Sequence, residues 1–209
     1  MIKCYKKPSY PIQNIVFLLN LYDYLNQAMK EKIVLHDKTF VPFISNEEIE
    51  KAIDELAARM NAEFEGCEDV PVLLCVLNGA ILFTAELMKR LDFPIELMSM
   101  KLSSYTGTHT SGEVKTVMGL TGNVKDRMVI IVEDIVDTGN TIVKIKEILK
   151  DAGAKDSKVC TLLLKPEVYK QEYRLDYVGK SIPNAFIVGF GLDYDELGRN
   201  LPDIYVLGQ

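Results

Sequence analysis

The stretch VIIVEDIVDTGNTI, residues Val129–Ile142, decides the fold because it joins an apolar run to a turn and a helix. Its first four residues are β-branched and apolar, as in strands that are buried on both faces of a sheet. A strand is predicted over Met128–Glu133, so Glu133 and Asp134 stand where we expect the chain to leave the core. A turn comes next, and a helix is predicted from Thr141 to Ala152. This segment therefore predicts the strand–turn–helix unit of a parallel sheet.

The turn has the composition of a phosphate-binding loop. It consists of Asp137, Thr138, Gly139, Asn140 and Thr141. Its backbone N–H groups, together with the positive end of the following helix, would favour a bound phosphate. The two carboxylates upstream suit ribose hydroxyls or Mg²⁺. The alternative is an ordinary connection in which Asp137 or Thr138 caps the helix and both acids are solvated.

Strands and helices alternate along the rest of the chain. Further strands are expected at Val70–Leu77, Ile95–Leu102, Val114–Leu120, Lys158–Leu164, Ala185–Gly189 and Ile204–Leu207. Further helices are expected from Ser45 to about Asn61, opened by a capping box, and over Ala80–Leu91. Gly153 is the expected left-handed residue after the helix that ends at Ala152. The alternation predicts an α/β fold with a doubly wound, mainly parallel sheet, whose ligands bind beyond the carboxyl ends of the strands.

Composition narrows the class of protein. The chain has 209 residues, enough for one α/β domain with a core that needs no disulfide or metal. Its net charge of −6 provides no basic surface for nucleic acid. Cys75 and Cys160 lie inside apolar runs, and the cysteines show no C-x-x-C spacing, as expected in a reducing cytoplasm. His36 and His109 are isolated, so we expect no histidine metal site.

The first 28 residues are treated apart from a domain at residues 29–209. Within them, Ile15–Leu25 is apolar but interrupted by Asn20 and Asp23, too short and too polar to span a bilayer. Lysines precede it, as in a signal peptide, but no small-residue cleavage site follows. Three alternatives stay open: an extension that packs poorly or is disordered, a mis-assigned start with translation beginning at Met29, and a functional targeting segment.

Polar residues also follow other predicted strands. Asn78 and Gly79 follow Val70–Leu77, Lys165 follows Lys158–Leu164, and Asp193 follows the last long apolar run. Taken singly, these are an ordinary strand–helix turn, a solvated strand end and a loop acid. The polar span from Ser103 to Glu113 would likewise be a surface loop.

In this order, however, these segments resemble the type I purine phosphoribosyltransferase family, and most closely its members that use 6-oxopurines. The likeness extends from about Lys32 to Leu207. It implies the type I phosphoribosyltransferase fold, with a small hood formed by the chain ends and a mobile loop. It also implies transfer of the 5-phosphoribosyl group of phosphoribosyl diphosphate (PRPP) to N9 of hypoxanthine, and of guanine as well. The products would be IMP or GMP and pyrophosphate, in purine salvage in the cytoplasm.

The same resemblance implies a role for each segment. PRPP would be bound by Glu133, Asp134, Asp137, Thr138, Gly139, Asn140 and Thr141, and pyrophosphate by Asn78, Gly79 and Arg199. The purine would be bound by Lys165, Phe186, Ile187 and Asp193, and the mobile loop would contain Ser104 and Tyr105. Mg²⁺ would be held by Glu133, Asp134 and Asp193. Asp137 would act as general acid and base near purine N7.

Three details of this resemblance indicate how the substrates would be recognised. An ammonium group only donates hydrogen bonds, so Lys165 favours the keto oxygen of a 6-oxopurine over the amino group of adenine. Phe186 would stack on the base, and the backbone of Ile187 would meet its Watson–Crick edge. The purine enzymes commonly carry Lys-Gly where this chain has Asn78-Gly79, often after a cis peptide, so backbone amides rather than a charged side chain would bind pyrophosphate.

Two alternative functions remain open from the sequence. One is a transferase that prefers xanthine or accepts a wider set of 6-oxopurines. The other is a regulator of the same fold that binds RNA, which the acidic balance disfavours. The family also implies a homodimer or homotetramer, with small-molecule substrates and neither nucleic acid nor membrane as partners.

Overall fold

The computed structural model describes residues 32–104 and 114–208 and contains two sheets. The larger holds β3 (Val72–Leu77), β4 (Glu96–Ser104), β5 (Val114–Met118), β6 (Met128–Val136), β7 (Asp156–Leu164) and β8 (Tyr177–Ser181). Their order is β5-β4-β3-β6-β7-β8, with all neighbours parallel except the β4–β5 pair. The predicted α/β fold with a mainly parallel sheet is therefore confirmed.

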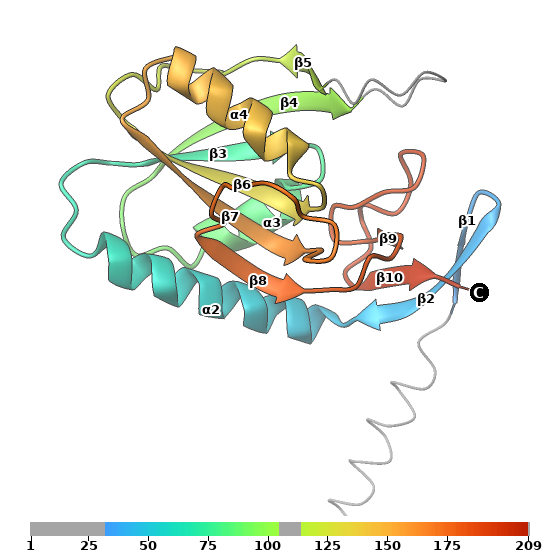
Figure 1. Cartoon of the computed structure of the whole chain (residues 1–209). Helices are drawn as coiled ribbons and strands as arrows, with labels where there is room; N and C mark the ends of the chain where they lie inside the picture. The colour runs from blue at the N-terminus through green and yellow to red at the C-terminus, as the bar shows by residue number, and fades with distance from the viewer. Residues whose placement is uncertain (1–31, 105–113, 209) are drawn as a thin grey trace, which may run out of the picture.

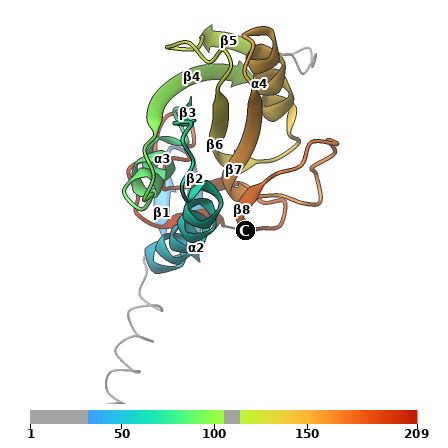
Figure 2. The same cartoon turned by 90° about the vertical axis from the view of Figure 1, so that its left-hand side faces the viewer.

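Within the described residues, three helices cover the two faces of this sheet (Figures 1 and 2). They are α2 (Asn46–Phe64), α3 (Ile81–Met88) and α4 (Asn140–Asp151). The views agree that α2 and α3 lie on one face and α4 on the other. The predicted capping box is present, because Ser45 Oγ accepts from the N–H of Glu48 and the Glu48 carboxylate accepts from the N–H of Ser45. Gly153 is left-handed, with φ +77°, as expected after α4.

The alternating side chains of β6 show why the apolar run is buried on both faces. Ile130 and Val132 join the core beneath α2 and α3, whereas Val129 and Ile131 join the core beneath α4. All four are fully buried. Burying each such side chain contributes roughly 1.5–3 kcal/mol, so this one strand anchors both layers.

A smaller antiparallel sheet forms the hood that was expected from the chain ends. It contains β1 (Ile33–Leu35), β2 (Lys38–Ile44), β9 (Ile187–Val188) and β10 (Ile204–Leu207), in the order β1-β2-β10-β9. In Figure 1 the parallel strands of the larger sheet point toward this hood. The hood therefore stands at the edge where ligands of such sheets bind.

Several bounds differ from those predicted. The β1–β2 hairpin and β8 were not predicted at all, since β2 contains Pro42, and β8 is an edge strand with a glycine and a lysine. Helix α3 was expected to reach Leu91 but ends at Met88, where the chain tightens into i→i−3 hydrogen bonds from Arg90 and Leu91. Helix α2 continues beyond Asn61 to Phe64, which is buried.

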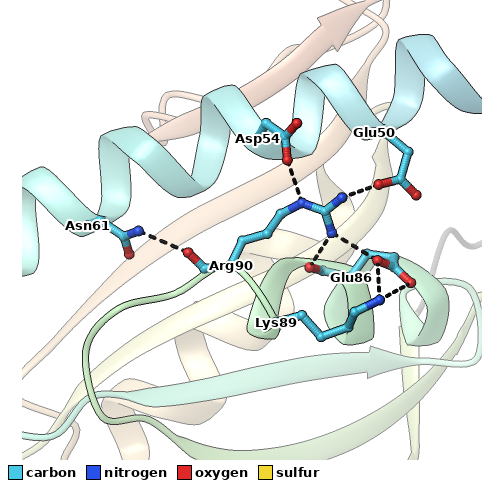
Figure 3. Close-up of polar contacts among 6 residues, drawn as sticks. All are labelled: Glu50, Asp54, Asn61, Glu86, Lys89 and Arg90. Carbon is cyan, nitrogen blue, oxygen red and sulfur yellow. Dashed lines mark hydrogen bonds and ion pairs between the residues drawn. The ribbon is translucent and has the colours of Figure 1, made fainter.

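Arg90 ties α2 to the end of α3 (Figure 3). Its guanidinium donates to the carboxylates of Asp54, at 2.6 Å, and Glu86, at 2.9 Å, and it also pairs with Glu50. Asp54 and Glu50 belong to α2 and Glu86 to α3. One cation therefore joins three carboxylates and fixes the two helices against each other.

Some predictions fall outside the described residues: the extension at 1–28 and Tyr105 of the expected mobile loop. Ser104 ends β4, where its backbone pairs with Val114. Within the described ranges, no helix combines the length and apolar character that a membrane crossing requires.

Candidate active site

The acid pair lies inside a strand rather than after it. The prediction that the strand ends at Glu133 is wrong, because β6 continues to Val136. Ile135 and Val136 pair with Leu163 and Leu164 of β7, and Val136 is buried in the core beneath α4. The strand continues past the acids because Ile135 and Val136 still pair with β7, and Val136 packs in the core beneath α4.

Burial makes both acids of this pair unusual. Oε2 of Glu133 is buried and has no hydrogen-bond partner among the described residues. Burial first, and the charge of Asp134 second, raise the pKa of Glu133 well above its usual range. Burial also raises the pKa of Asp134 to about 6, although the N–H of Ile135 and the charge of Arg199 act in the opposite direction. A buried carboxylate without a partner is costly, so this pair is suited to a cation or to hydroxyl donors.

The Asn78–Gly79 turn packs directly against this acid pair. The Leu77–Asn78 peptide is cis, as the resemblance implied. A Cβ atom on Gly79 would lie 1.7 Å from Oδ2 of Asp134, and one on Gly191 would lie 2.0 Å from the carbonyl oxygen of Gly79. Only glycine fits at either position. The predicted pyrophosphate turn, the acid pair and the C-terminal loop therefore meet at one point.

The turn before α4 has no side-chain cap. Gly139 occupies the N-cap position with φ +82°, and no side chain bonds the first turn of the helix. The alternative in which Asp137 or Thr138 caps α4 is therefore wrong. Within residues 32–104 and 114–208, no hydrogen bond is donated by the backbone N–H of any residue from Asp137 to Thr141. Five amides at the positive end of a helix are thus free to bind an anion.

Gln171 holds this turn from its other side. Its Nε2 donates to the carbonyl oxygen of Thr138 and to Oδ1 of Asn140, both at 3.1 Å. A Cβ atom on Gly139 would lie 2.6 Å from Gln171 Cγ and 2.6 Å from Tyr169 Cε2. The hydrogen bonds from Gln171 are accepted by oxygen atoms of the turn and leave its backbone N–H groups free. The turn is therefore held in place before an anion binds.

Lys165 is buried rather than solvated at its strand end. It is 9% exposed, and its Nζ lies 3.3 Å from Oδ2 of Asp137. Its backbone N–H donates to the carbonyl oxygen of Val136 at 3.0 Å. The residue expected to bind a purine oxygen therefore contacts the residue expected to transfer a proton.

Arg199 and Asp193 form a second pair in the C-terminal loop. Arg199 Nη2 lies 2.7 Å from Oδ1 of Asp193, and Nη1 donates to the carbonyl oxygen of Gly191 at 2.8 Å. Oδ2 of Asp193 accepts from the N–H of Glu196 at 2.8 Å. Nε of Arg199 is buried without a partner among the residues that the structure describes. Arg199 is thus held in place with donor capacity left over.

A cleft of about 770 Å³ lies between the turn at Asn78 and the loop that carries Asp193 and Arg199. Its lining includes Leu77, Asn78, Lys101, Leu102, Phe186, Asp193, Tyr194, Asp195, Glu196 and Arg199. Phe186 is 44% exposed at this cleft, whereas the side chain of Ile187 is buried in β9. No group of three or more metal-binding side chains gathers within the described part of the chain.

Sequence reasoning missed Lys101, Tyr194 and Gln171. Lys101 is a polar residue near the carboxyl end of β4, so the rule that selected Asn78 and Lys165 could have found it. Tyr194 stands next to Asp193 but carries no signal of its own, because aromatic residues are common in cores. Gln171 lies in a loop whose position only the fold reveals.

Comparison with known proteins shows which family the chain resembles in sequence. A family model described as the phosphoribosyl transferase domain matches residues 44–195. The hypoxanthine-guanine phosphoribosyltransferase of Lactococcus lactis is 47% identical over 165 residues, covering 78% of this chain and 88% of that protein. The protein of the same name from Bacillus subtilis is 43% identical over 165 residues, covering 78% of this chain and 91% of that protein.

The fold is also similar to solved structures of hypoxanthine phosphoribosyltransferases. The crystal structure of a hypoxanthine phosphoribosyltransferase from Staphylococcus aureus has a TM-score of 0.74 and 37% identity, covering 80% of this chain and 91% of that one. The hypoxanthine phosphoribosyl transferase of Trypanosoma cruzi has a TM-score of 0.75 and 34% identity, covering 84% of this chain and 95% of that one.

Proposed function

The chain belongs to the phosphoribosyl transferase domain family, and we propose that it transfers the 5-phosphoribosyl group of PRPP to N9 of hypoxanthine and guanine. The C1–pyrophosphate bond of PRPP breaks and a bond from C1 to purine N9 forms. The single proton of the purine imidazole ring leaves, and the products are IMP or GMP and pyrophosphate. This reaction serves purine salvage.

The observation that carries the proposal is the set of free amides from Asp137 to Thr141. They stand at the N-terminus of α4 and donate no hydrogen bond within the described residues. A dianionic 5-phosphate would satisfy several of them at once and would gain from the helix dipole. The carboxylates of Glu133 and Asp134 lie just upstream on β6 and would accept from the ribose hydroxyls.

The base would lie in the cleft beside Phe186. Stacking on an aromatic ring is worth roughly 1–3 kcal/mol per base and discriminates little among bases. Discrimination would instead come from Lys165, whose ammonium donates to a 6-oxo group, and from the backbone at Ile187. Asp137 contacts that ammonium and would take or return a proton at purine N7.

The pyrophosphate would leave between the Asn78–Gly79 turn and Arg199. Asn78 and Arg199 line the same cleft, and Arg199 is oriented by Gly191 and Asp193. Its guanidinium presents several donors in a fixed plane, which suits a phosphate group. Turn amides supply the remaining contacts, because the chain has no lysine at position 78.

The donor set fits Mg²⁺, which we assign as the cofactor. Mg²⁺ prefers carboxylate oxygens and takes one or two of them beside substrate phosphates, and the unpartnered Oε2 of Glu133 offers such an oxygen. Glu133 and Asp134 would hold it, with Asp193 as a third candidate whose oxygens already face Arg199 and Glu196. When bound, Mg²⁺ would neutralise charge on the leaving pyrophosphate.

Two further assignments belong to this proposal. A homodimer or homotetramer follows from the family and would be tested by sedimentation of the purified protein. A cytoplasmic location follows from the same family and from buried, unpaired thiols such as Cys75 and Cys160. Cell fractionation would test it.

One assay tests the activity. Purified protein is given Mg²⁺ and PRPP, with hypoxanthine, guanine, xanthine and adenine offered in parallel, and nucleotide formation is followed by absorbance. We expect IMP and GMP to form and AMP to be absent. Preferred formation of XMP would favour the xanthine-specific alternative, and no product from any base would reject the proposal.

A further inference from the structure

The hydroxyl of Tyr194 is bound to the turn between β1 and β2. It donates to Oδ1 of Asp37 at 2.6 Å and accepts from Nζ of Lys38 at 2.8 Å. The Lys38 ammonium also lies 4.6 Å from the centroid of the Tyr194 ring. Both hydrogen-bonding functions of the phenol are thus used by the protein, and neither is left for a substrate.

The segment that carries Tyr194 is fixed as well. Tyr194 and Leu197 exchange two backbone hydrogen bonds, at 2.9 and 3.1 Å, around Asp195 and Glu196. These two residues have φ values of +49° and +68°, a left-handed geometry that side chains other than glycine adopt at a cost. Nε2 of His36 lies 3.1 Å from the carbonyl oxygen of Asp195 and so holds the turn against the hairpin.

The Tyr194 ring in turn contacts Phe186. The two ring centroids are 5.7 Å apart at an interplanar angle of 89°, an edge-to-face arrangement. Phe40 of β2 is fully buried beneath both rings, with centroids 6.0 Å from Phe186 and 6.1 Å from Tyr194. Phe186 is therefore supported by two rings and still 44% exposed at the cleft.

We propose that Tyr194 is a positioning residue for the purine base. The β1–β2 turn fixes the Tyr194 ring, and that ring holds Phe186 in the orientation that stacks on the base. The inference rests on the proposed function, because it assigns the stacking role to Phe186. It gives the N-terminal hairpin, which contributes none of the expected catalytic groups, a part in recognising the substrate.

The competing reading is that this cluster only stabilises the hood. A purely structural cluster would affect the affinity for the base and for PRPP alike, or would change only the stability of the fold. A positioning cluster would affect the base selectively. Steady-state constants for the two substrates, measured separately, therefore distinguish the two roles.

The test uses Tyr194→Phe, Asp37→Asn and Lys38→Met in the full chain. We expect Tyr194→Phe to raise the KM for hypoxanthine by about three- to tenfold, the effect of one or two net hydrogen bonds. The KM for PRPP and kcat should change by less than about twofold, because Tyr194→Phe removes no group that the proposed function assigns to PRPP. Asp37→Asn should also raise the KM for hypoxanthine. Both substitutions act on the same hydrogen bond between Tyr194 and Asp37, so the double variant should raise this KM by less than the product of the two single increases.

Lys144→Met is the matched control for Lys38→Met. Lys144 pairs with Glu147 on the surface of α4 at 3.2 Å and does not line the cleft. This variant should leave both KM values unchanged. Thermal unfolding of each variant identifies any general loss of folding.

A second readout does not depend on turnover. Nuclear Overhauser effects between the Tyr194 and Phe186 rings should be present in the wild type and weakened in Tyr194→Phe and Asp37→Asn. An unchanged KM for hypoxanthine with unchanged ring contacts overturns the positioning role, as does an equal rise in both KM values. If the wild-type protein makes no nucleotide at all, the proposed function fails, and the ring contacts alone decide whether the turn orients Phe186.

Discussion

Nζ of Lys165 lies 3.3 Å from Oδ2 of Asp137, although the two residues are 28 positions apart in the chain. The register of the sheet explains the contact. Val136 of β6 pairs with Leu164 of β7, so the residues that follow them leave the same edge side by side. A donor for a purine oxygen and a candidate acid–base group are thus brought together by parallel strand pairing.

Replacing Lys165 with methionine should weaken binding of the base selectively. The variant keeps much of the buried stem but removes the ammonium group that we propose donates to the 6-oxo group, so the KM for hypoxanthine should rise about 10- to 100-fold. The KM for PRPP should change little. Initial-rate kinetics with each substrate varied in turn checks this, and an equal loss for both substrates would point instead to a folding defect.

Asp137→Asn should lower turnover without weakening PRPP binding. The amide cannot take up or return a proton, and general acid–base catalysis contributes typically about 10²- to 10⁴-fold. The amide can still accept from Lys165, so the local structure should persist. The relevant values are kcat and the Kd for PRPP by calorimetry, and a variant with wild-type kcat would exclude Asp137 from proton transfer.

Gly79→Ala should disrupt the pyrophosphate turn. The new Cβ would lie 1.7 Å from Oδ2 of Asp134, so the turn or the acid pair must move. Misplaced groups of this kind commonly cost about 10²-fold in kcat/KM, and we expect at least that loss.

Gly119→Ala is the matched control for this change, because a Cβ there meets nothing within 4 Å. It should keep nearly wild-type activity and stability. If Gly79→Ala were as active as Gly119→Ala, the packing of the turn against Asp134 would not matter for the reaction.

Arg90→Met should destabilise the fold without entering the chemistry. Three carboxylates would lose their shared cation, and we expect a loss of about 1–3 kcal/mol in the free energy of unfolding. Lys89→Met is the control, since Lys89 is largely exposed and pairs only with Glu86 among the described residues, so its loss should cost about 0–1 kcal/mol. Urea unfolding of both variants compares them, and equal midpoints would show that the Arg90 cluster adds nothing.

Local sequence patterns predicted most of the larger sheet and the helices that cover it. Strand β10 was predicted with its correct bounds, and the capping box at Ser45 and the left-handed Gly153 were also found. Each depends on neighbouring residues alone. The end of β6 was missed because two acids suggest a surface, whereas pairing with β7 continues past them.

The arrangement of the site was less accessible from sequence. Polar residues after strands identified Asn78 and Lys165, since parallel strands end at one edge. Asp193 was found because it follows the last long apolar run, although β9 belongs to the antiparallel hood. The contact between Tyr194 and the β1–β2 turn joins residues 156 and 157 positions apart, and it depends on a hairpin that was not predicted. No local pattern encodes such a contact.

The free amides from Asp137 to Thr141 carry the central claim, and backbone NMR during titration with PRPP and Mg²⁺ tests it most directly. We predict large chemical-shift changes and slowed hydrogen exchange at these five N–H groups, saturating with the same Kd as calorimetry. Titration with hypoxanthine alone should leave them unchanged. If PRPP binds while these five signals stay unperturbed, the phosphate is held elsewhere and the proposed site is wrong.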